Sequence, residues 1–139
     1  MIVCDTGPLV AAALSKDKDH LACVALFNDL HAQGRALLVP ATVAAEVGFL
    51  LNREAGPRVE SLFLRSLAEG TFTPCELVAE DYARMAELVE TYASMQLGTT
   101  DASVVAISER LNSTDVATLD RRHFSVVRPS HADALRLLP

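Results

Sequence analysis

The sequence lacks tryptophan and holds only five phenylalanines and two tyrosines in 139 residues. Because aromatic side chains are scarce, a hydrophobic core has to be assembled mainly from Ala, Val and Leu. Half of the residues are hydrophobic and 22% are charged, which is typical of a folded globular protein and not of a disordered chain. The length, together with the absence of repeats and linker-like segments, indicates a single domain over residues 1–139.

Cysteine is also scarce, and its pattern excludes two classes of small protein. Cys4, Cys23 and Cys75 are odd in number and form no CxxC pair, which argues against a disulfide framework and a structural zinc site. No basic leader precedes the first apolar residues, and the longest apolar run, residues 36–45, is too short to span a bilayer. We therefore expect a soluble protein of the reducing cytoplasm with no membrane partner.

Short apolar segments alternate with amphipathic segments along the chain. We predict strands at residues 2–4, 36–39, 71–75, 115–119 and 125–127. We predict helices at residues 9–14, 20–33, 42–53, 58–69, 79–95 and 100–111. The strand at 71–75 belongs at an edge of the sheet, because Pro74 has no N–H to donate to a ladder. The alternation favours an α/β fold, with a central parallel sheet of about four to five strands covered by helices on both faces.

Glu46 is the only charged residue from position 36 to position 51. Helical spacing puts it on the same face as Val43 and Leu50, so its carboxylate points toward the expected core. Burying a lone carboxylate costs on the order of several kcal/mol, and no Lys or Arg lies within one helical turn of it. Glu46 therefore pairs with a distant arginine, lies at the rim of the apolar face, or belongs to a functional site.

Three aspartates lie where ligands are often bound. Asp101 is in the first turn of a predicted helix, on the side of Val104 and Val105, although the helix dipole alone also favours an acid there. Asp5 and Asp120 each directly follow an apolar strand. The carboxyl ends of parallel strands line the crevice where ligands bind, but aspartate is also a common turn residue. Taken singly, none of these acids establishes a site.

The four acids are informative in combination. Two strand-end acids, a helix-start acid and a core-facing acid can converge on one crevice, where they repel one another unless a cation binds. A set of oxygen ligands selects Mg²⁺ or Mn²⁺ over zinc or copper. Setting aside these four of the 18 acids leaves 14 against 12 bases, a balance of −2 in place of −6. Net charge thus argues against tight non-specific binding of nucleic acid, but not against a metal-dependent nuclease.

Four parts of the sequence together resemble the PIN-domain family, and more narrowly the VapC-type toxins of type II toxin–antitoxin pairs. They are residues 2–6 (IVCDT), Glu46, residues 97–103 (LGTTDAS) and residues 118–124 (TLDRRHF). Each motif is short, but their order and spacing are distinctive, and the resemblance runs from residue 1 to about residue 129. It implies a PIN-like three-layer fold and an acidic site made of Asp5, Glu46, Asp101 and Asp120.

The resemblance also implies an activity, which is hydrolysis of RNA by a Mg²⁺- or Mn²⁺-dependent endoribonuclease. The bound cation would lower the pKa of an attacking water molecule and stabilise charge on the phosphate. Asp5 and Asp101 are the first choice as direct metal ligands. Glu46 and Asp120 are expected to bind directly or through water, and Thr6 to orient a ligand or a water molecule. The implied partners are RNA, a second copy of the chain, and a cognate antitoxin on the helices at 9–30 and 43–51.

Arg121, Arg122 and His123 directly follow Asp120. At the lip of the crevice such residues can hold the phosphates of a substrate. The alternative is that they form an ordinary solvated loop after a strand.

Other functions remain to be weighed. A non-catalytic PIN-like module that binds RNA or protein is the main alternative, although a phosphate binder gains nothing from concentrated negative charge. A DNA nuclease ranks lower, because the chain lacks the long insertions of such enzymes. A phosphoacceptor domain is disfavoured, because Asp5 is followed by Thr6 and Gly7 where such domains pair adjacent acids, and because the only lysines, Lys16 and Lys18, lie in a predicted loop. A phosphatase of the DxD kind is disfavoured because position 7 is Gly. Neither GxGxxG nor GxxxxGKS/T is present, so nucleotide binding has no support.

Overall fold

A computed structural model describes all 139 residues and contains one five-stranded sheet. The strands are β1 (Ile2–Cys4), β2 (Leu37–Pro40), β3 (Thr73–Cys75), β4 (Asp115–Ala117) and β5 (Arg136–Leu138). They lie in the order β3-β2-β1-β4-β5, and every neighbouring pair is parallel. The predicted α/β class with a parallel sheet is confirmed, and β3 lies at an edge as Pro74 requires.

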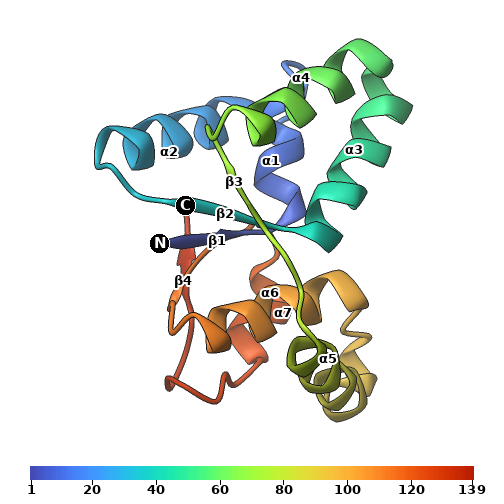
Figure 1. Ribbon diagram of the computed structural model, residues 1–139, viewed down its shortest axis with the longest axis vertical. Helices are drawn as coiled ribbons and strands as arrows, with labels where there is room; N and C mark the ends of the chain where they lie inside the picture. The colour runs from blue at the N-terminus through green and yellow to red at the C-terminus, as the bar shows by residue number, and fades with distance from the viewer.

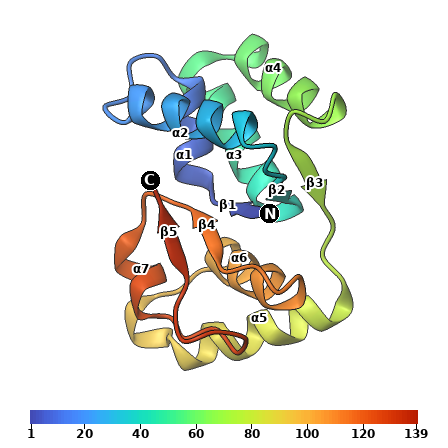
Figure 2. The ribbon, with the colours of Figure 1, turned by 90° about the vertical axis from the view of Figure 1, so that its left-hand side faces the viewer.

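Helices cover both faces of the sheet, which makes a three-layer arrangement (Figure 1). They are α1 (Thr6–Ala13), α2 (His20–Ala32), α3 (Ala41–Ala55), α4 (Pro57–Ala68), α5 (Ala79–Thr91), the 3₁₀ turn η1 (Ala93–Met95), α6 (Thr99–Arg110) and α7 (Arg121–Val126). In the turned view of Figure 2, α1 to α4 lie together on one side of the sheet and α5 to α7 on the other. None of these helices is both long and apolar enough to cross a membrane.

The core is continuous and built from aliphatic side chains, as the scarcity of aromatic residues predicts. Twenty-five buried residues form one hydrophobic cluster. The central strand β1 is fully buried on both faces, which explains why it reads as an uninterrupted apolar run in the sequence. Strands β1 and β4 therefore form a rigid base, and the residues that follow them are held in defined positions.

Two ion pairs fasten α6 to α5. Arg110 donates to both carboxylate oxygens of the buried Asp81 at 3.0 and 3.1 Å. The second oxygen of Asp81 also accepts from the backbone N–H of Val78, which closes the first turn of α5. Arg84 on α5 binds Glu109 on α6 through two hydrogen bonds of 2.9 and 3.0 Å. Because the carboxylates are largely shielded from solvent, these contacts fix the position of α6 more firmly than surface ion pairs would.

One predicted strand is wrong. Residues 125–127 were expected to form the last strand, but residues 121–126 form helix α7, and β5 is the last strand instead. The reason is local, because the Asp120 side chain accepts a hydrogen bond from the His123 backbone N–H at 3.0 Å and caps the helix. Phe124 and Val127 then lie three residues apart on the buried side, a helical spacing.

Candidate active site

The strand order creates a crevice beside the central strand. From β1 the chain moves outward to β2 and β3, and then returns to the other side of β1 to form β4 and β5. Open parallel sheets bind ligands at such a reversal, at the carboxyl ends of the two strands that flank it. Asp5 directly follows β1, and Asp120 lies in the loop between β4 and α7. Both acids therefore emerge at the reversal point, as their strand-end positions predict.

Helices bring the other two acids to the same edge. Helix α3 begins immediately after β2, so Glu46 lies only two turns from the carboxyl end of that strand. Helix α6 precedes β4 in the chain and must run opposite to it, so α6 begins at the carboxyl edge of the sheet. Asp101 is in the first turn of α6, as predicted. Four separate elements thus each deliver one carboxylate.

The four acids line a single cavity of about 670 Å³. Its lining consists of Asp5, Thr6, Gly7, Glu46, Gly98, Thr99, Thr100, Asp101, Leu119 and Asp120. No lysine or arginine is among them, and Leu119 is the only hydrophobic member. The cavity wall therefore carries negative charge that no arginine or lysine of the wall balances.

Asp5 is the most buried of these acids, at 6% exposure. The pKa of Asp5 is raised from 3.8 to about 6, chiefly by burial and to a smaller extent by the negative charges of Asp101 and Asp120. Hydrogen bonds from the Thr118 hydroxyl, 2.8 Å from Oδ2, and from the Thr6 backbone only partly offset this rise. Asp5 is therefore held in a fixed orientation, in a place where its charge is costly.

Asp101 and Glu46 are half-buried. Burial raises the pKa of Asp101, the charges of Asp120 and Glu46 raise it as well, and His123 lowers it in part. The Thr6 hydroxyl donates to Glu46 Oε2 at 3.2 Å. Thr6 thus orients an acid side chain, which is the kind of supporting contact expected for it. No arginine or lysine pairs with Glu46.

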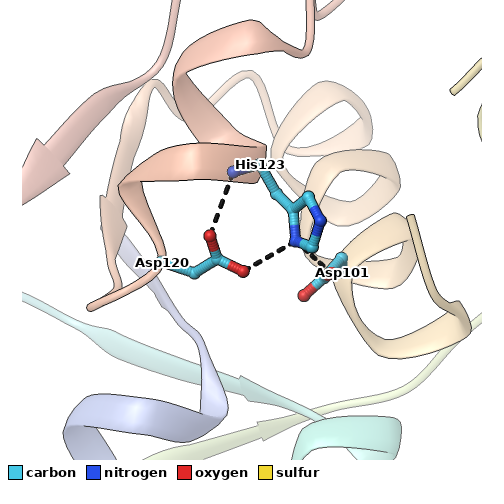
Figure 3. A group of neighbouring side chains, drawn as sticks. All are labelled: Asp101, Asp120 and His123. Carbon is cyan, nitrogen blue, oxygen red and sulfur yellow. Dashed lines mark hydrogen bonds and ion pairs between the residues drawn. The ribbon is translucent and has the colours of Figure 1, made fainter. Parts of the chain in front are cut away.

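His123 lies against two of the acids (Figure 3). Its Nδ1 is 2.7 Å from Asp120 Oδ2 and 3.2 Å from Asp101 Oδ2, and its Nε2 is 2.8 Å from the Met95 carbonyl oxygen. Burial lowers the pKa of His123, but the hydrogen bonds to Met95 and Asp120 and the two negative charges outweigh this, so its pKa is raised. Both ring nitrogens are engaged within the protein, a different arrangement from the phosphate contact considered for this residue.

Arg121 and Arg122 are exposed in the first turn of α7, beside the cavity but not in its lining. The Arg121 guanidinium donates to the carbonyl oxygen of Pro139, the last residue. Arg122 makes no hydrogen bond or ion pair with another side chain. Of the three basic residues considered for substrate binding, Arg122 is therefore the one whose charge is free.

Two supporting features of the site were not predicted from the sequence. Thr118 donates to Asp5 and accepts from the Asp120 backbone N–H at 2.9 Å, so it joins the two strand-end acids. Its only signal in the sequence is a polar residue within an apolar run. Thr42 and Ser103 approach with their hydroxyl oxygens 2.6 Å apart, which links α3 to α6. That pair had no signal, because the residues are 61 positions apart.

The donor chemistry of the site fits a divalent cation. Asp101, Asp120 and His123 each place one ligand atom within 4.8 Å of the others, and Asp5 and Glu46 line the same cavity. Burial, and to a smaller extent the charges of the neighbouring carboxylates, raise the pKa of Asp5 and Asp101 and so disfavour their ionised forms. A cation would remove this repulsion. Carboxylate oxygens suit Mg²⁺ and Mn²⁺, whereas structural zinc sites are rich in cysteine and histidine.

Comparison with proteins of known structure supports the same architecture. The VapC20 toxin of Mycobacterium tuberculosis, described as cleaving the sarcin-ricin loop, superposes with a TM-score of 0.81 at 18% identity, over 96% of this chain and 99% of that one. VapBC2 of Rickettsia felis, solved with a DNA fragment of its promoter, gives 0.71 at 15% identity over both full chains. FitAcB of Neisseria gonorrhoeae gives 0.61 at 19% identity, over 100% of this chain and 97% of that one. At such identities these matches establish the fold.

Sequence comparison establishes the family. Ribonuclease VapC26 of Mycobacterium tuberculosis (strain ATCC 25618 / H37Rv) is 30% identical over 138 residues, which is 99% of this chain and 100% of the relative. The sequence profile described as PIN domain matches residues 2–128. The chain therefore belongs to the PIN domain family, in its VapC-type branch.

Proposed function

We propose that this protein is a Mg²⁺- or Mn²⁺-dependent endoribonuclease that acts as the toxin of a toxin–antitoxin pair. The observation that carries the proposal is the convergence of Asp5, Glu46, Asp101 and Asp120, from four different elements, on one cavity. Evenly spread surface acids would not raise the pKa of a neighbour, whereas here burial and mutual repulsion do so at Asp5 and Asp101. A purely structural role does not explain why the protein keeps carboxylates in a place that disfavours their ionised form.

We assign the acids different parts in holding the cation. Asp5 and Asp101 are the first candidates for direct ligands, because burial and the neighbouring carboxylates raise the pKa of both and so disfavour their ionised forms without a cation. Glu46 and Asp120 bind directly or through water. Thr6 fixes the Glu46 carboxylate, and Thr118 fixes that of Asp5. These hydroxyl contacts keep the carboxylates aimed at the cavity, and such preorganisation contributes to both binding and catalysis.

The chemistry needs no nucleophilic side chain. A divalent cation bound here would lower the pKa of an attacking water molecule and stabilise the negative charge on the phosphate. The hydroxyls of Thr6 and Ser103 are engaged with Glu46 and with the Thr100 carbonyl, and neither has a histidine or lysine beside it to act as a base. The chain's own contribution is to hold the cation, to orient the phosphate and to keep the acid side chains in place.

RNA is the proposed substrate because the relative that this chain matches over its whole length is named a ribonuclease, and the VapC20 neighbour is described as cleaving the sarcin-ricin loop. Attack by water does not by itself distinguish RNA from DNA. We further propose that residues 1–139 act as one domain, since one sheet and one buried cluster extend through them. A cytoplasmic location is consistent with the three free cysteines, and cell fractionation would test it.

The proposed partners are a cognate antitoxin and a second copy of the chain. Structural neighbours include toxin–antitoxin complexes of the VapBC type. Helices α2 and α3 leave Leu21 and Phe49 exposed at 81% and 64%, on the helices expected to receive the antitoxin. A Phe49→Asp variant that still cleaves RNA should escape inhibition by the antitoxin, and full inhibition would exclude this surface. Light scattering of the isolated protein tests the homodimer directly.

The test of the proposed activity is cleavage of labelled single-stranded RNA by purified protein with Mn²⁺ or Mg²⁺, with chelator, and by an Asp101→Asn variant. We expect cleavage that requires the cation and falls by at least about 10²-fold in the variant, because the charge of one cation ligand is lost. Circular dichroism confirms that the variant is folded. Activity that survives both chelator and mutation would contradict the carboxylate–metal mechanism.

Substrate binding by α7 gives a separate expectation. Arg122→Ala is expected to raise KM with kcat unchanged, and to lower the slope of log KM against log salt concentration by about 0.7, the effect of one contact to a single-stranded phosphate. Arg65→Ala, on α4 across the sheet, is the matched control and should change neither value. An unchanged KM and salt slope in Arg122→Ala would place the substrate elsewhere.

The non-catalytic binding module remains the second candidate function. It predicts RNA binding that is independent of divalent cations and no cleavage under any condition. Binding measured by fluorescence anisotropy with and without chelator, beside the cleavage assay, separates the two functions.

A further inference from the structure

His123 makes more contacts with the site than any other residue outside the four acids. Its backbone N–H donates to Asp120 Oδ1 at 3.0 Å, and its ring Nδ1 lies 2.7 Å from Asp120 Oδ2. Both oxygens of Asp120 are therefore held by the same residue. A helix-capping aspartate needs only the first of these contacts, and its second oxygen is otherwise free to turn toward solvent. The ring is what fixes the remaining orientation of this carboxylate.

The same ring reaches the element that delivers Asp101. Nδ1 is 3.2 Å from Asp101 Oδ2 (Figure 3), and Nε2 is 2.8 Å from the carbonyl oxygen of Met95. Met95 ends η1, and the short segment that follows it runs directly into α6, in whose first turn Asp101 lies. His123 thus joins α7, which follows Asp120, to the entrance of α6. No other side chain forms a hydrogen bond or an ion pair with both acids.

The His123 ring lies on the side of the two carboxylates that faces away from the cavity. His123 is absent from the cavity lining, although Asp101 and Asp120 are both part of it, and its side chain is only 18% exposed. A phosphate in the cavity would meet the two acids first. Contact with substrate therefore does not account for the position of the ring.

We propose that His123 is a positioning residue, which sets the separation and orientation of Asp101 and Asp120 and through them the affinity of the site for a divalent cation. The inference rests on the proposed function, because it assigns the cation to these acids. Partners that orient ligating side chains change metal affinity by about 10–100-fold when they are removed. Of the two ring nitrogens, Nδ1 is the one that matters, since Nε2 contacts the Met95 carbonyl and not the carboxylates.

Substitution of His123 by asparagine or by glutamine tests the contacts of the two ring nitrogens separately. In His123→Asn the amide nitrogen lies near the place of Nδ1 and keeps a donor for Asp120, but cannot reach Met95. In His123→Gln the amide reaches the place of Nε2 and keeps the Met95 contact, but removes the donor from the acids. His123→Ala removes both contacts. His31→Ala is the matched control, because His31 also binds a carbonyl oxygen, that of Thr71, but lies at an exposed position of α2.

Titration calorimetry with Mn²⁺ and with Mg²⁺ alone, without RNA, gives the primary readout. We expect His123→Ala and His123→Gln to weaken both ions by about 10–100-fold, His123→Asn to stay within about threefold of wild type, and His31→Ala to be unchanged. In the cleavage assay, excess Mn²⁺ should restore kcat of His123→Ala with KM for RNA unchanged. Thermal unfolding in chelator shows whether each variant is folded.

The outcomes distinguish the inference from its rivals. A higher KM that excess Mn²⁺ does not correct would make His123 a substrate contact and overturn the proposal. A loss confined to Mn²⁺ would make it a direct nitrogen ligand, since nitrogen donors favour Mn²⁺ over Mg²⁺. Equal affinity in wild type and His123→Ala would also overturn it. Absence of Mn²⁺ and Mg²⁺ binding by the wild-type protein would instead contradict the proposed function itself.

Discussion

An Asp5→Asn variant is expected to resist unfolding better than the wild-type protein above pH 7 and to cleave RNA at least about 10²–10³-fold more slowly. Burial raises the pKa of Asp5 from 3.8 to about 6, so folding disfavours the ionised carboxylate. One pKa unit corresponds to about 1.4 kcal/mol, so removal of the charge should raise the free energy of unfolding of the metal-free protein by about 3 kcal/mol. The asparagine keeps an oxygen that can accept from Thr118.

The pH dependence of this gain has a definite sign. Between pH 4 and pH 6 the folded wild-type protein binds a proton at Asp5 that the unfolded chain has released, so its stability falls as pH rises through this window. The advantage of Asp5→Asn should therefore be absent near pH 4 and complete above pH 7. Urea unfolding in chelator at both pH values measures the difference, with Asp29→Asn, at an exposed position of α2, as the control. If Asp5→Asn were less stable than wild type at pH 8, the ionised Asp5 carboxylate would not destabilise the folded protein and the prediction would be wrong.

Mn²⁺ at about 100 times its dissociation constant is expected to raise the free energy of unfolding by about 2.7 kcal/mol and Tm by roughly 10 °C. The cation binds the folded arrangement of acids, which the unfolded chain does not have. Because binding requires ionised Asp5, the rise in Tm should shrink as pH falls below 6, which is opposite in direction to the metal-free stability. A single transition is expected if the residues act as one domain.

Differential scanning calorimetry at pH 5, 6 and 7.5, with and without Mn²⁺, measures both trends. Asp5→Asn supplies the control, since it should lose most of the Mn²⁺-dependent rise at every pH. A rise of equal size in that variant would mean that the ion binds outside the cavity, and a rise independent of pH would exclude Asp5 as a ligand.

Much of the fold was predictable because local pattern and tertiary environment agree. Strand β1 has the bounds predicted for it, since a strand buried on both faces reads as a continuous apolar run. Strand β3 was placed at an edge by the missing donor of Pro74. Residues 125–127 were mistaken for a strand because Val126 and Val127 were considered without the helix cap that Asp120 supplies. Strand β5 was missed because three residues at the end of the chain carry too little pattern to be recognised.

The acids of the site were easier to predict than the residues that orient them. A carboxylate such as that of Glu46 can be recognised from the sequence alone, because it is the only charged group in an apolar stretch. A hydroxyl such as that of Thr118 gives no comparable signal, because threonine is common in apolar segments. Its contact with Asp5 joins residues 113 positions apart in the sequence. The turn of His123 toward the Met95 carbonyl likewise depends on packing between segments that are distant in sequence.

The insertion of β4 between β1 and β5 has a consequence for the protein during its synthesis. Strand β1 pairs with β4 through Val3 and Val116. One edge of β1, the first strand to be synthesised, therefore stays unpaired until almost the whole chain has been made. Any nascent chain that ends before residue 120 lacks one of the four acids and one wall of the cavity. A ribosome that stalls or terminates early therefore releases a fragment without a complete set of acids, and the proposed cation site can form only after the message has been read almost to its end.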